Sequence, residues 1–419
     1  MTDSPQPRPR WPPLPRTFAA LRHRNYRLFF AGQLISVSGT WMQNLALSWL
    51  IYQLTNSAFL LGVISSLGSL PMALFAIPGG VLADRVDRRR IMLVTQSSAM
   101  VLAFVLAALT GGHWIRVWQV AVLAVFSGTV MACDMPARQA FVVEMVARED
   151  LMNAIALNSS IFNAGRIIGP SIAGALVAVV GVAWCFFING LSFIAVLVAL
   201  VLMRIPRRPR RPEVTGVMAD ALGGLRYVRS NSTVLRMAVM LAVFSIFGWS
   251  YAVLMPVFAR DVLHVGARGL GYLMTSSGVG ALAGALTVAS GSGRHLRRLL
   301  FGGAVLMSAS LVAFSFSRVL PLSALLLALV GMGGLAFMSA ANTTIQLSVP
   351  DEVRGRMMGV WGLVIAGTAP LGSLQAGAMA EYLGAPAAVR LGACIMAAAT
   401  LAAIVVVRRR ARGEPREEE

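Results

Sequence analysis

This sequence contains no lysine, and its 36 basic side chains other than histidine are all arginine. Without lysine, the chain can form neither a Walker-type phosphate loop nor a Schiff base, which excludes ATP hydrolysis by that loop and imine chemistry. Charged residues are scarce at 13%, against about 25% in soluble domains, whereas hydrophobic residues reach 57%, against about 45–50%. The sequence is therefore too apolar for an ordinary soluble protein.

Cysteine and histidine are also scarce, because the sequence contains three cysteines and four histidines. The odd number of cysteines, all of them inside apolar segments, argues against a disulfide framework. The histidines lie in predicted tails or loops and lack the spacing of metal ligands. We therefore expect neither a metal site nor a cofactor.

Apolar stretches of about 20 residues or more separate the clusters of charge, and this length crosses about 30 Å of hydrocarbon as an α-helix. Backbone amides in lipid must be satisfied within their own segment, and the stretches lack the alternation of a β-barrel strand. The sequence predicts an all-α polytopic membrane protein with twelve helices in two six-helix bundles. The predicted helices are Tyr26–Leu54, Ala58–Ala83, Ile91–Leu109, Val117–Val143, Asn153–Val180, Ala183–Met203, Val234–Phe258, Gly269–Ser290, Leu299–Phe316, Pro321–Leu347, Met357–Tyr382 and Ala387–Val407.

Arginine is distributed unevenly around these segments. With both termini on one side, the tails and loops of that side carry 28 arginines, against five on the opposite side. The positive-inside rule then predicts that both termini are cytoplasmic, in a plasma (inner) membrane. Because the basic residues flank apolar segments, the net charge of +19 needs no nucleic acid partner.

The chain divides near its middle at segment 205–232, which opens with Arg-Pro repeats and continues with the amphipathic piece Val217–Arg229. The two sides echo each other, since Gly62, Arg85, Arg88 and Arg89 recur at one fixed spacing as Gly271, Arg294, Arg297 and Arg298. Two matched six-helix bundles joined by a cytoplasmic linker are a known transporter plan, with the substrate site between them. The expected parts are a basic tail (1–25), an N-terminal bundle (26–204), the linker (205–232), a C-terminal bundle (233–408) and a second tail (409–419).

The loop after the second predicted helix reads Gly80-Val-Leu-Ala-Asp84-Arg85-Val-Asp87-Arg88-Arg89-Arg90. It resembles the signature loop G-x-L-A-D-R-x-G-R-K of the major facilitator superfamily, with Asp87 where that pattern has glycine. The resemblance implies that Gly80, Asp84, Arg85, Arg88 and Arg89 belong to a gate.

Asp84 ends its helix, where the helix dipole disfavours a negative charge. We expect it to dock at the N-terminus of the eleventh helix, after Pro350, when the cytoplasmic gate is closed. The alternative is an ordinary surface ion pair between Asp84 and Arg88, worth about 0–1 kcal/mol.

The fifth predicted helix contains Gly165-Arg166-Ile-Ile-Gly169-Pro170-Ser-Ile-Ala-Gly174. This run resembles the glycine-proline motif of drug/proton antiporters, although Ala156 and Ala173 replace two of the motif's glycines. The residues around Pro136–Gln139 and Asn158–Asn163 resemble the branch that includes enterobactin and macrolide exporters. Small residues at this spacing let helices approach closely, so the motif either seals one route or serves packing alone.

Four charged residues in these helices are candidates for substrate or proton handling: Asp134, Arg138, Glu144 and Arg166. Arg166 lies near the midplane, where an arginine costs about 2.5–3.5 kcal/mol and needs a partner or a wet cavity. It contacts substrate or the proton path, or it binds carbonyl groups freed by Pro170. Asp134 and Arg138 share a helix face, and the guanidinium favours an ionised carboxylate. A structural pair is therefore favoured over a proton carrier, and its extension to Arg88 stays open.

Glu144 is the other acid of the fourth helix, at its cytoplasmic edge. Aromatic and amide side chains suit an amphipathic ligand, because apolar contact supplies affinity and a few hydrogen bonds fix the pose. Some of these side chains could instead be interfacial anchors or bonds between helices. The cavity candidates are Trp41, Gln43, Asn44, Asn158, Asn163, Trp249, Tyr251, Asn342, Trp361 and Gln375.

The resemblance implies a secondary active transporter that exports a drug or siderophore-like compound by proton antiport through alternating access. The expected partners are this substrate, protons and the lipid bilayer, and the expected state is a monomer. An importer or facilitator on the same scaffold stays open. A membrane-embedded enzyme would need a catalytic dyad or a His/Asp pair in the membrane, where no histidine lies, so we expect no enzyme; a transport-dead sensor stays open.

Overall fold

The computed structural model describes residues 16–204, 223, 226–290 and 295–413, and every regular element in these ranges is helical. A short 3-10 segment, Arg16–Arg22, precedes the first long helix, and another, Arg148–Asp150, precedes the fifth. The helices of the N-terminal half are α1 (Arg24–Thr55), α2 (Ala58–Arg85), α3 (Arg88–Gly111), α4 (Val117–Met145), α5 (Leu151–Val179) and α6 (Val182–Leu202). Each agrees with its predicted span to within a few residues.

The C-terminal half repeats this pattern after the predicted linker, most of which lies outside the described residues, as do 1–15 and 414–419. The all-α membrane class predicted from the sequence is confirmed. The helices of this half are α8 (Ser232–Val243), α9 (Met255–Val257), α10 (Gly266–Ser290), α11 (Leu296–Phe316), α12 (Leu320–Ser348), α13 (Asp351–Leu383) and α14 (Ala385–Gly413).

The segment predicted as one membrane helix, Val234–Phe258, lies within an apolar span, Val234–Val262, but is not one continuous α-helix. After α8 the chain forms a π-helical turn (Phe244–Gly248), a 3-10 segment (Trp249–Leu254), α9 and a second π-helical turn that ends at Val262. Pro256 has no backbone N–H, and π and 3-10 turns shift the register of the helical hydrogen bonds. The apolar pattern that predicted this segment depends on length and burial, and does not report such changes of helix type.

Eleven of the described segments are long and apolar enough to cross a membrane. The segment from α8 to Val262 counts as one of them despite its irregular turns. The helix α1 is not among the eleven, although its 32 residues exceed the length required. It carries Gln33, Gln43 and Asn44 in its apolar stretch, which lower its hydropathy.

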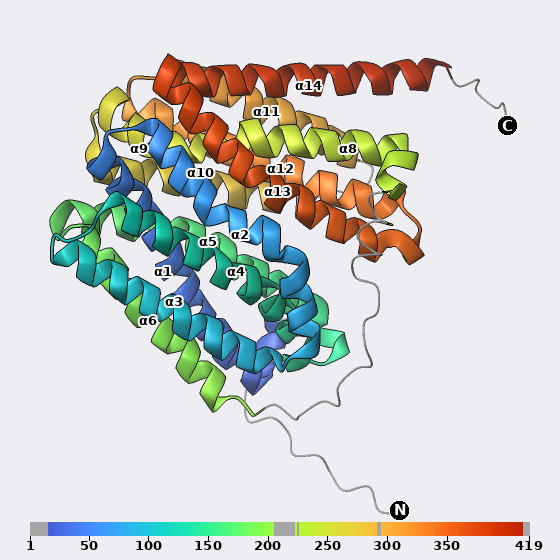
Figure 1. Cartoon of the computed structure of the whole chain (residues 1–419). Coiled ribbons are helices and arrows are strands. Elements are labelled where there is room, and N and C mark those ends of the chain that lie inside the picture. Colours follow the sequence, from blue (N-terminus) through green and yellow to red (C-terminus); the bar gives the residue numbers. More distant parts are fainter. Residues whose placement is uncertain (1–15, 205–222, 224–225, 291–294, 414–419) are drawn as a thin grey trace, which may run out of the picture.

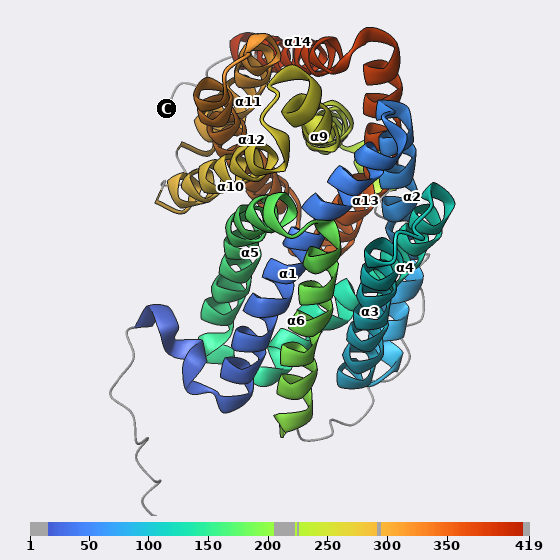
Figure 2. The same ribbon diagram turned by 90° about the vertical axis from the view of Figure 1, so that its left-hand side faces the viewer.

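The two sets of helices form two bodies that meet along α2 with α13 and α5 with α10 (Figures 1 and 2). Figure 1 shows the bodies close together at the end where α9 lies and diverging toward the opposite end. We name the diverging end, where α2 ends at Arg85 and α6 ends beside Arg204, the Arg-rich end. The Arg-poor end is the other, where α2 begins at Ala58 and α13 ends at Leu383.

Glycine allows the two halves to touch backbone to backbone near the Arg-poor end. A Cβ atom on Gly62 of α2 would lie 2.8 Å from the Cα atom of Gly377 of α13. A Cβ atom on Gly174 of α5 would lie equally close, 2.8 Å, to the Cα atom of Gly271 of α10. Gly62 and Gly271 are partners in the internal repeat, so equivalent residues of the two halves make equivalent crossings.

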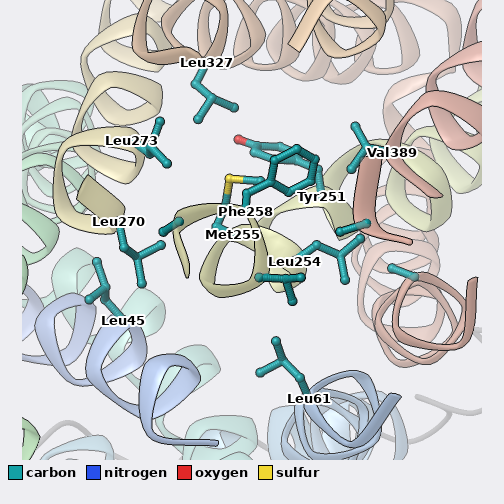
Figure 3. Packing of buried hydrophobic residues seen from close by; sticks show 14 of the residues in the cluster. Leu45, Leu61, Tyr251, Leu254, Met255, Phe258, Leu270, Leu273, Leu327 and Val389 are labelled. Atoms are coloured by element: carbon teal, nitrogen blue, oxygen red, sulfur yellow. The ribbon is translucent and has the colours of Figure 1, made fainter. Parts of the chain in front are cut away.

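An apolar layer lies between these two crossings. Figure 3 shows Leu61 of α2 pointing toward Leu254 of the irregular segment, and Leu45 of α1 pointing toward Leu270 of α10. Leu61 and Met255 have no exposed surface, and Leu254 retains only 1%. The halves are therefore joined by close packing at this end.

Candidate functional site

Polar bonds join the halves at the Arg-poor end. The Tyr52 hydroxyl of α1 donates to a carboxylate oxygen of Asp261, and Arg260 Nη1 donates to Asn56 Oδ1 at 2.6 Å. The Arg260 guanidinium also lies over the Tyr52 ring, 5.5 Å from its centroid. The spacing that relates Gly62 to Gly271 also relates Tyr52 to Asp261, so equivalent ends of the two halves meet here.

A second acid completes this set. Glu381, near the end of α13, accepts hydrogen bonds from the Ser57 hydroxyl and the Phe59 backbone N–H, each at 3.0 Å. Its charge lies at the N-terminus of α2, where the helix dipole favours an anion. We name this group, which joins the halves at the Arg-poor end, the polar latch; it consists of Tyr52, Asn56, Ser57, Arg260, Asp261 and Glu381.

The signature loop lies at the Arg-rich end. Arg88 Nη1 donates to Glu144 Oε1 at 2.7 Å, so this arginine binds the edge of α4 and not Asp134. Asp87 accepts a hydrogen bond from the Arg90 backbone N–H at 3.1 Å and begins α3 with a φ of −56°. Glycine is therefore not required where the signature has it, because Asp87 serves as the helix cap.

The other residues of this loop are less constrained. Arg85 is exposed, a Cβ atom on Gly80 would meet no atom within 4 Å, and Arg89 Nη2 donates to the Val201 carbonyl at 3.0 Å. The side chain of Asp84 lies outside the described residues. Its docking at the start of α13 therefore stays a prediction.

The glycine-proline motif packs α5 between α1 and α10. A Cβ atom on Gly169 would lie 2.5 Å from Trp41 Cβ, while Gly174 makes the crossing with α10. The helix continues through Pro170, which has no N–H group to donate to the Arg166 carbonyl. This carbonyl packs against α10, since a Cβ atom on Gly278 would lie 2.9 Å from its oxygen. Gly165 faces α1, like Gly169, so this face of α5 serves the packing within the N-terminal half.

Asp134 belongs to a buried network inside the N-terminal half. Its carboxylate, in a residue 3% exposed, accepts hydrogen bonds from Thr95 Oγ1 and Gln96 Nε2, each at 2.8 Å. Arg138 Nη2 lies 3.4 Å from the other carboxylate oxygen, and Arg138 Nη1 donates to Gln33 Oε1 at 3.2 Å. Two donors and a guanidinium thus surround one carboxylate, an arrangement that ties α4 to α1 and α3.

Arg166 lies midway along α5, whose length is 29 residues, and reaches across to the C-terminal half. Its Nη2 atom donates to Ser277 Oγ of α10 at 3.3 Å, and this hydroxyl is 2.8 Å from the Tyr251 hydroxyl. Among the described residues, Arg166 makes no ion pair with a carboxylate. The structure therefore brings together two predicted residues, Arg166 and Tyr251, through a serine.

Most of the other cavity candidates have partners within their own half. Trp41 packs edge-on against Phe162 with ring centroids 5.4 Å apart, and Gln43 accepts a hydrogen bond from Asn189 at 2.7 Å. The amide of Asn163 donates to a carbonyl of its own helix, and those of Asn342 and Gln375 contact residues one turn away. Asn44 is exposed, whereas the remaining candidates are partly buried: Asn158, Trp249 and Trp361.

Sequence reasoning missed the polar latch and Ser277. A signal for the latch was present, because the internal repeat pairs Tyr52 with Asp261 and because acids are rare on the Arg-poor side. No comparable signal marks Ser277, which is one of many serines in the apolar segments.

Comparisons with known proteins extend over almost the whole chain. A family model described as transmembrane secretion effector matches residues 15–416. The multidrug efflux pump Tap of Mycolicibacterium fortuitum is 27% identical over 369 residues, which cover 85% of this chain and 89% of Tap. The enterobactin exporter EntS of Shigella boydii serotype 4 is 28% identical over 401 residues, covering 92% and 93%.

Solved structures share the fold at lower identity. A bacterial homologue of the human lysosomal transporter Spinster, in an inward-facing and occupied conformation, superposes with a TM-score of 0.70 at 14% identity. The match covers 94% of this chain and 97% of that chain.

Proposed function

Because this chain belongs to the transmembrane secretion effector family of the major facilitator superfamily, we propose that it exports a small amphipathic compound, a drug or a siderophore-like molecule, by proton antiport. The observation that carries this proposal is the asymmetry of the interface. The halves are joined at the Arg-poor end by glycine crossings, apolar packing and the polar latch, and they diverge toward the Arg-rich end. Such an arrangement suits alternating access, in which each end opens in turn.

We place the Arg-rich end in the cytoplasm and both termini on that side of a plasma (inner) membrane. The observed state then faces inward, with the polar latch as the closed outer gate. In this proposal α1 is the twelfth membrane-spanning helix, 26–204 and 233–408 are the two bundles, and 205–232 is the linker.

The outward-facing state needs a closed cytoplasmic gate. We propose that Asp84 closes it by docking at the N-terminus of α13, where the helix dipole favours a carboxylate. Arg88, held by Glu144, fixes the loop that carries Asp84. A surface ion pair of Asp84 with no gating role is the competing account.

Proton coupling supplies the driving force in this account. One charge that crosses 100 mV is worth about 2.3 kcal/mol, which corresponds to a gradient of roughly fifty-fold. Asp134 and Glu144 are the acids to test as proton carriers, although the donors around Asp134 favour a structural role. The protein acts as a monomer and a transporter, without enzymatic activity.

Inside-out membrane vesicles test the direction of transport. Three fluorescent probes share the dansyl group and differ in charge: dansyl-leucine is an anion, its methyl ester is neutral and dansylcadaverine is a cation. With an acidic lumen, vesicles that contain the protein should accumulate at least one probe beyond protein-free vesicles, and a protonophore should abolish the difference. Accumulation in right-side-out vesicles with acid outside would indicate an importer instead. Equal levels with and without the protein in both orientations would contradict transport of these compounds.

A further inference from the structure

The contacts between α5 and α10 form a line that ends at Arg166. From the Arg-poor end inward, Gly174 meets Gly271, the hydroxyls of Ser171 and Thr275 lie 2.8 Å apart, and Arg166 then reaches Ser277. Arg166 therefore makes the deepest of these bonds, farthest from the polar latch.

Toward the Arg-rich end from this bond, both helices carry exposed side chains. On α5, Phe162 is 52% exposed and Ser159 is also exposed; on α10, Leu282 is 38% exposed and Leu286 is 62% exposed. Arg166 itself is partly exposed, whereas Ser277 is fully buried. The Arg166 side chain, which makes the last of these bonds before the halves diverge, is therefore open to a bound cargo on its exposed side.

The positive charge of Arg166 is uncompensated among the described residues. Asp134 has a buried carboxylate within the membrane-spanning helices, but this carboxylate is bound by Arg138 inside the N-terminal half. The other described carboxylates lie at helix ends or in loops: Asp87, Glu144, Glu149, Asp150, Asp261, Asp351 and Glu381. A cation in a low-dielectric site without a carboxylate favours an anionic partner.

We propose that the exported cargo carries a carboxylate or a similar oxyanion, which binds Arg166 in place of Ser277. This inference rests on the proposed export function and names the class of its substrate. A guanidinium presents five donors in a planar fork and binds a carboxylate through two parallel bonds, whereas Ser277 offers a single neutral acceptor at 3.3 Å. Ser277 keeps the Tyr251 hydroxyl as a partner when the arginine leaves, so the exchange strands no buried hydroxyl.

The exchange links cargo binding to gating. While Arg166 holds Ser277, it adds a bond between the halves that must break before α5 and α10 can separate at the Arg-poor end. An anion that binds the arginine removes this bond and thus favours the state that opens outward. A neutral compound with the same apolar body occupies the space without breaking the bond.

Binding of the three dansyl probes to the protein in lipid nanodiscs tests this proposal. Wild-type protein should bind dansyl-leucine tighter than its methyl ester by about tenfold or more, and tighter than dansylcadaverine by a larger factor. Arg166→Gln should remove this preference, and Arg166→Lys should restore part of it, since lysine keeps the charge but not the fork.

Ser277→Ala separates the exchange from a simple charge effect. Removing the competing acceptor should tighten dansyl-leucine binding by about two- to tenfold and leave binding of the methyl ester unchanged. Ser308→Ala is the matched control, because Ser308 is equally buried but bonds a carbonyl of its own helix, α11; it should change neither affinity. The Ser277→Ala variant retains the arginine, so its dansyl-leucine affinity tests the exchange even if Arg166→Gln fails to fold.

Equal binding of the three probes by the wild type, or a preference for dansylcadaverine, would overturn the proposal. So would unchanged or weaker dansyl-leucine binding by Ser277→Ala. Proton-driven accumulation of dansylcadaverine in vesicles without any preference for the anion would leave export standing and refute only the anion site. Anion-selective binding without accumulation would support the site and contradict export.

Discussion

The two halves repeat one plan but hold their buried polar groups differently. The interior of the N-terminal half contains a carboxylate, Asp134, and the amides of Gln33, Gln96 and Asn189, which bond across helices. In the described part of the C-terminal half, the buried polar side chains other than Tyr251 are the hydroxyls of serine and threonine. Many of these, such as Ser308 and Thr400, bond a carbonyl of their own helix.

The first helix of each half differs in the same sense. The helix α1 is continuous over 32 residues, whereas its counterpart changes between α, π and 3-10 turns from Ser232 to Val262. That irregular segment supplies Tyr251 to the Arg166 site and Asp261 to the polar latch. The difference shows that bonds between helices cross-link the N-terminal half, whereas the irregular first segment of the C-terminal half contributes to both the Arg166 site and the polar latch.

The largest expected effect breaks the N-terminal network. Asp134→Ala leaves Arg138, Thr95 and Gln96 without their acceptor, and an uncompensated buried charge costs about 3–5 kcal/mol of unfolding free energy. The measurement is the thermal unfolding midpoint of purified protein, with Ser308→Ala from the C-terminal half as the comparison at about 1 kcal/mol or less. Equal losses in the two variants would refute the contrast between the halves.

A second prediction concerns the two glycine crossings. Gly174→Val and Gly62→Val should each prevent close approach of the halves. Overpacking costs about 1–3 kcal/mol, so each variant should shift the population toward an open Arg-poor end by about 5- to 150-fold. Accessibility of a cysteine introduced at Leu254, which is 1% exposed while the Arg-poor end is closed, measures the shift. Gly302→Ala is the control, since its Cβ atom meets nothing within 4 Å. Different outcomes for the two valine variants would break the equivalence of the crossings.

Removing one acid of the polar latch should have a smaller effect. Glu381→Ala removes the acceptor for Ser57 and Phe59, and bonds worth about 0.5–1.5 kcal/mol each shift the population in the same direction by about 2- to 10-fold per bond. The same labelling assay at Leu254 reports the shift. If Glu381→Ala left labelling unchanged, the polar latch would not act as a gate.

The smallest effect is expected at the opposite end. Asp84→Asn removes a charge whose interaction with the α13 dipole is worth about 0.3–1 kcal/mol, so it should favour the inward-facing state by about 2- to 5-fold. Labelling at Leu254 should therefore decrease, opposite in sign to the effect of Glu381→Ala. An increase in labelling would contradict docking of Asp84 at α13.

The sequence alone predicted the fold class and nearly every helix, because apolar length is set by the lipid and charge marks the helix ends. Over Val234–Phe258 it predicted the membrane span but not the changes of helix type, which depend on local hydrogen bonds. The Asp134–Arg138 pair was predicted, since residues four apart on one helix necessarily share a face. The bonds of Arg166 with Ser277 and of Tyr52 with Asp261 join helices of different halves, and no local pattern reports such contacts.

Distances between spin labels across the two ends test the central claim most directly. With the native cysteines replaced, one pair joins Leu54 to Tyr382 across the Arg-poor end, and the other joins Val86 to Leu347 across the Arg-rich end. The account predicts that Glu381→Ala increases two populations together, relative to the otherwise wild-type protein. One is the population with a long Leu54–Tyr382 distance, and the other is the population with a short Val86–Leu347 distance. If both distances lengthened together, or if one changed while the other stayed fixed, the two ends would not alternate and the account would be contradicted.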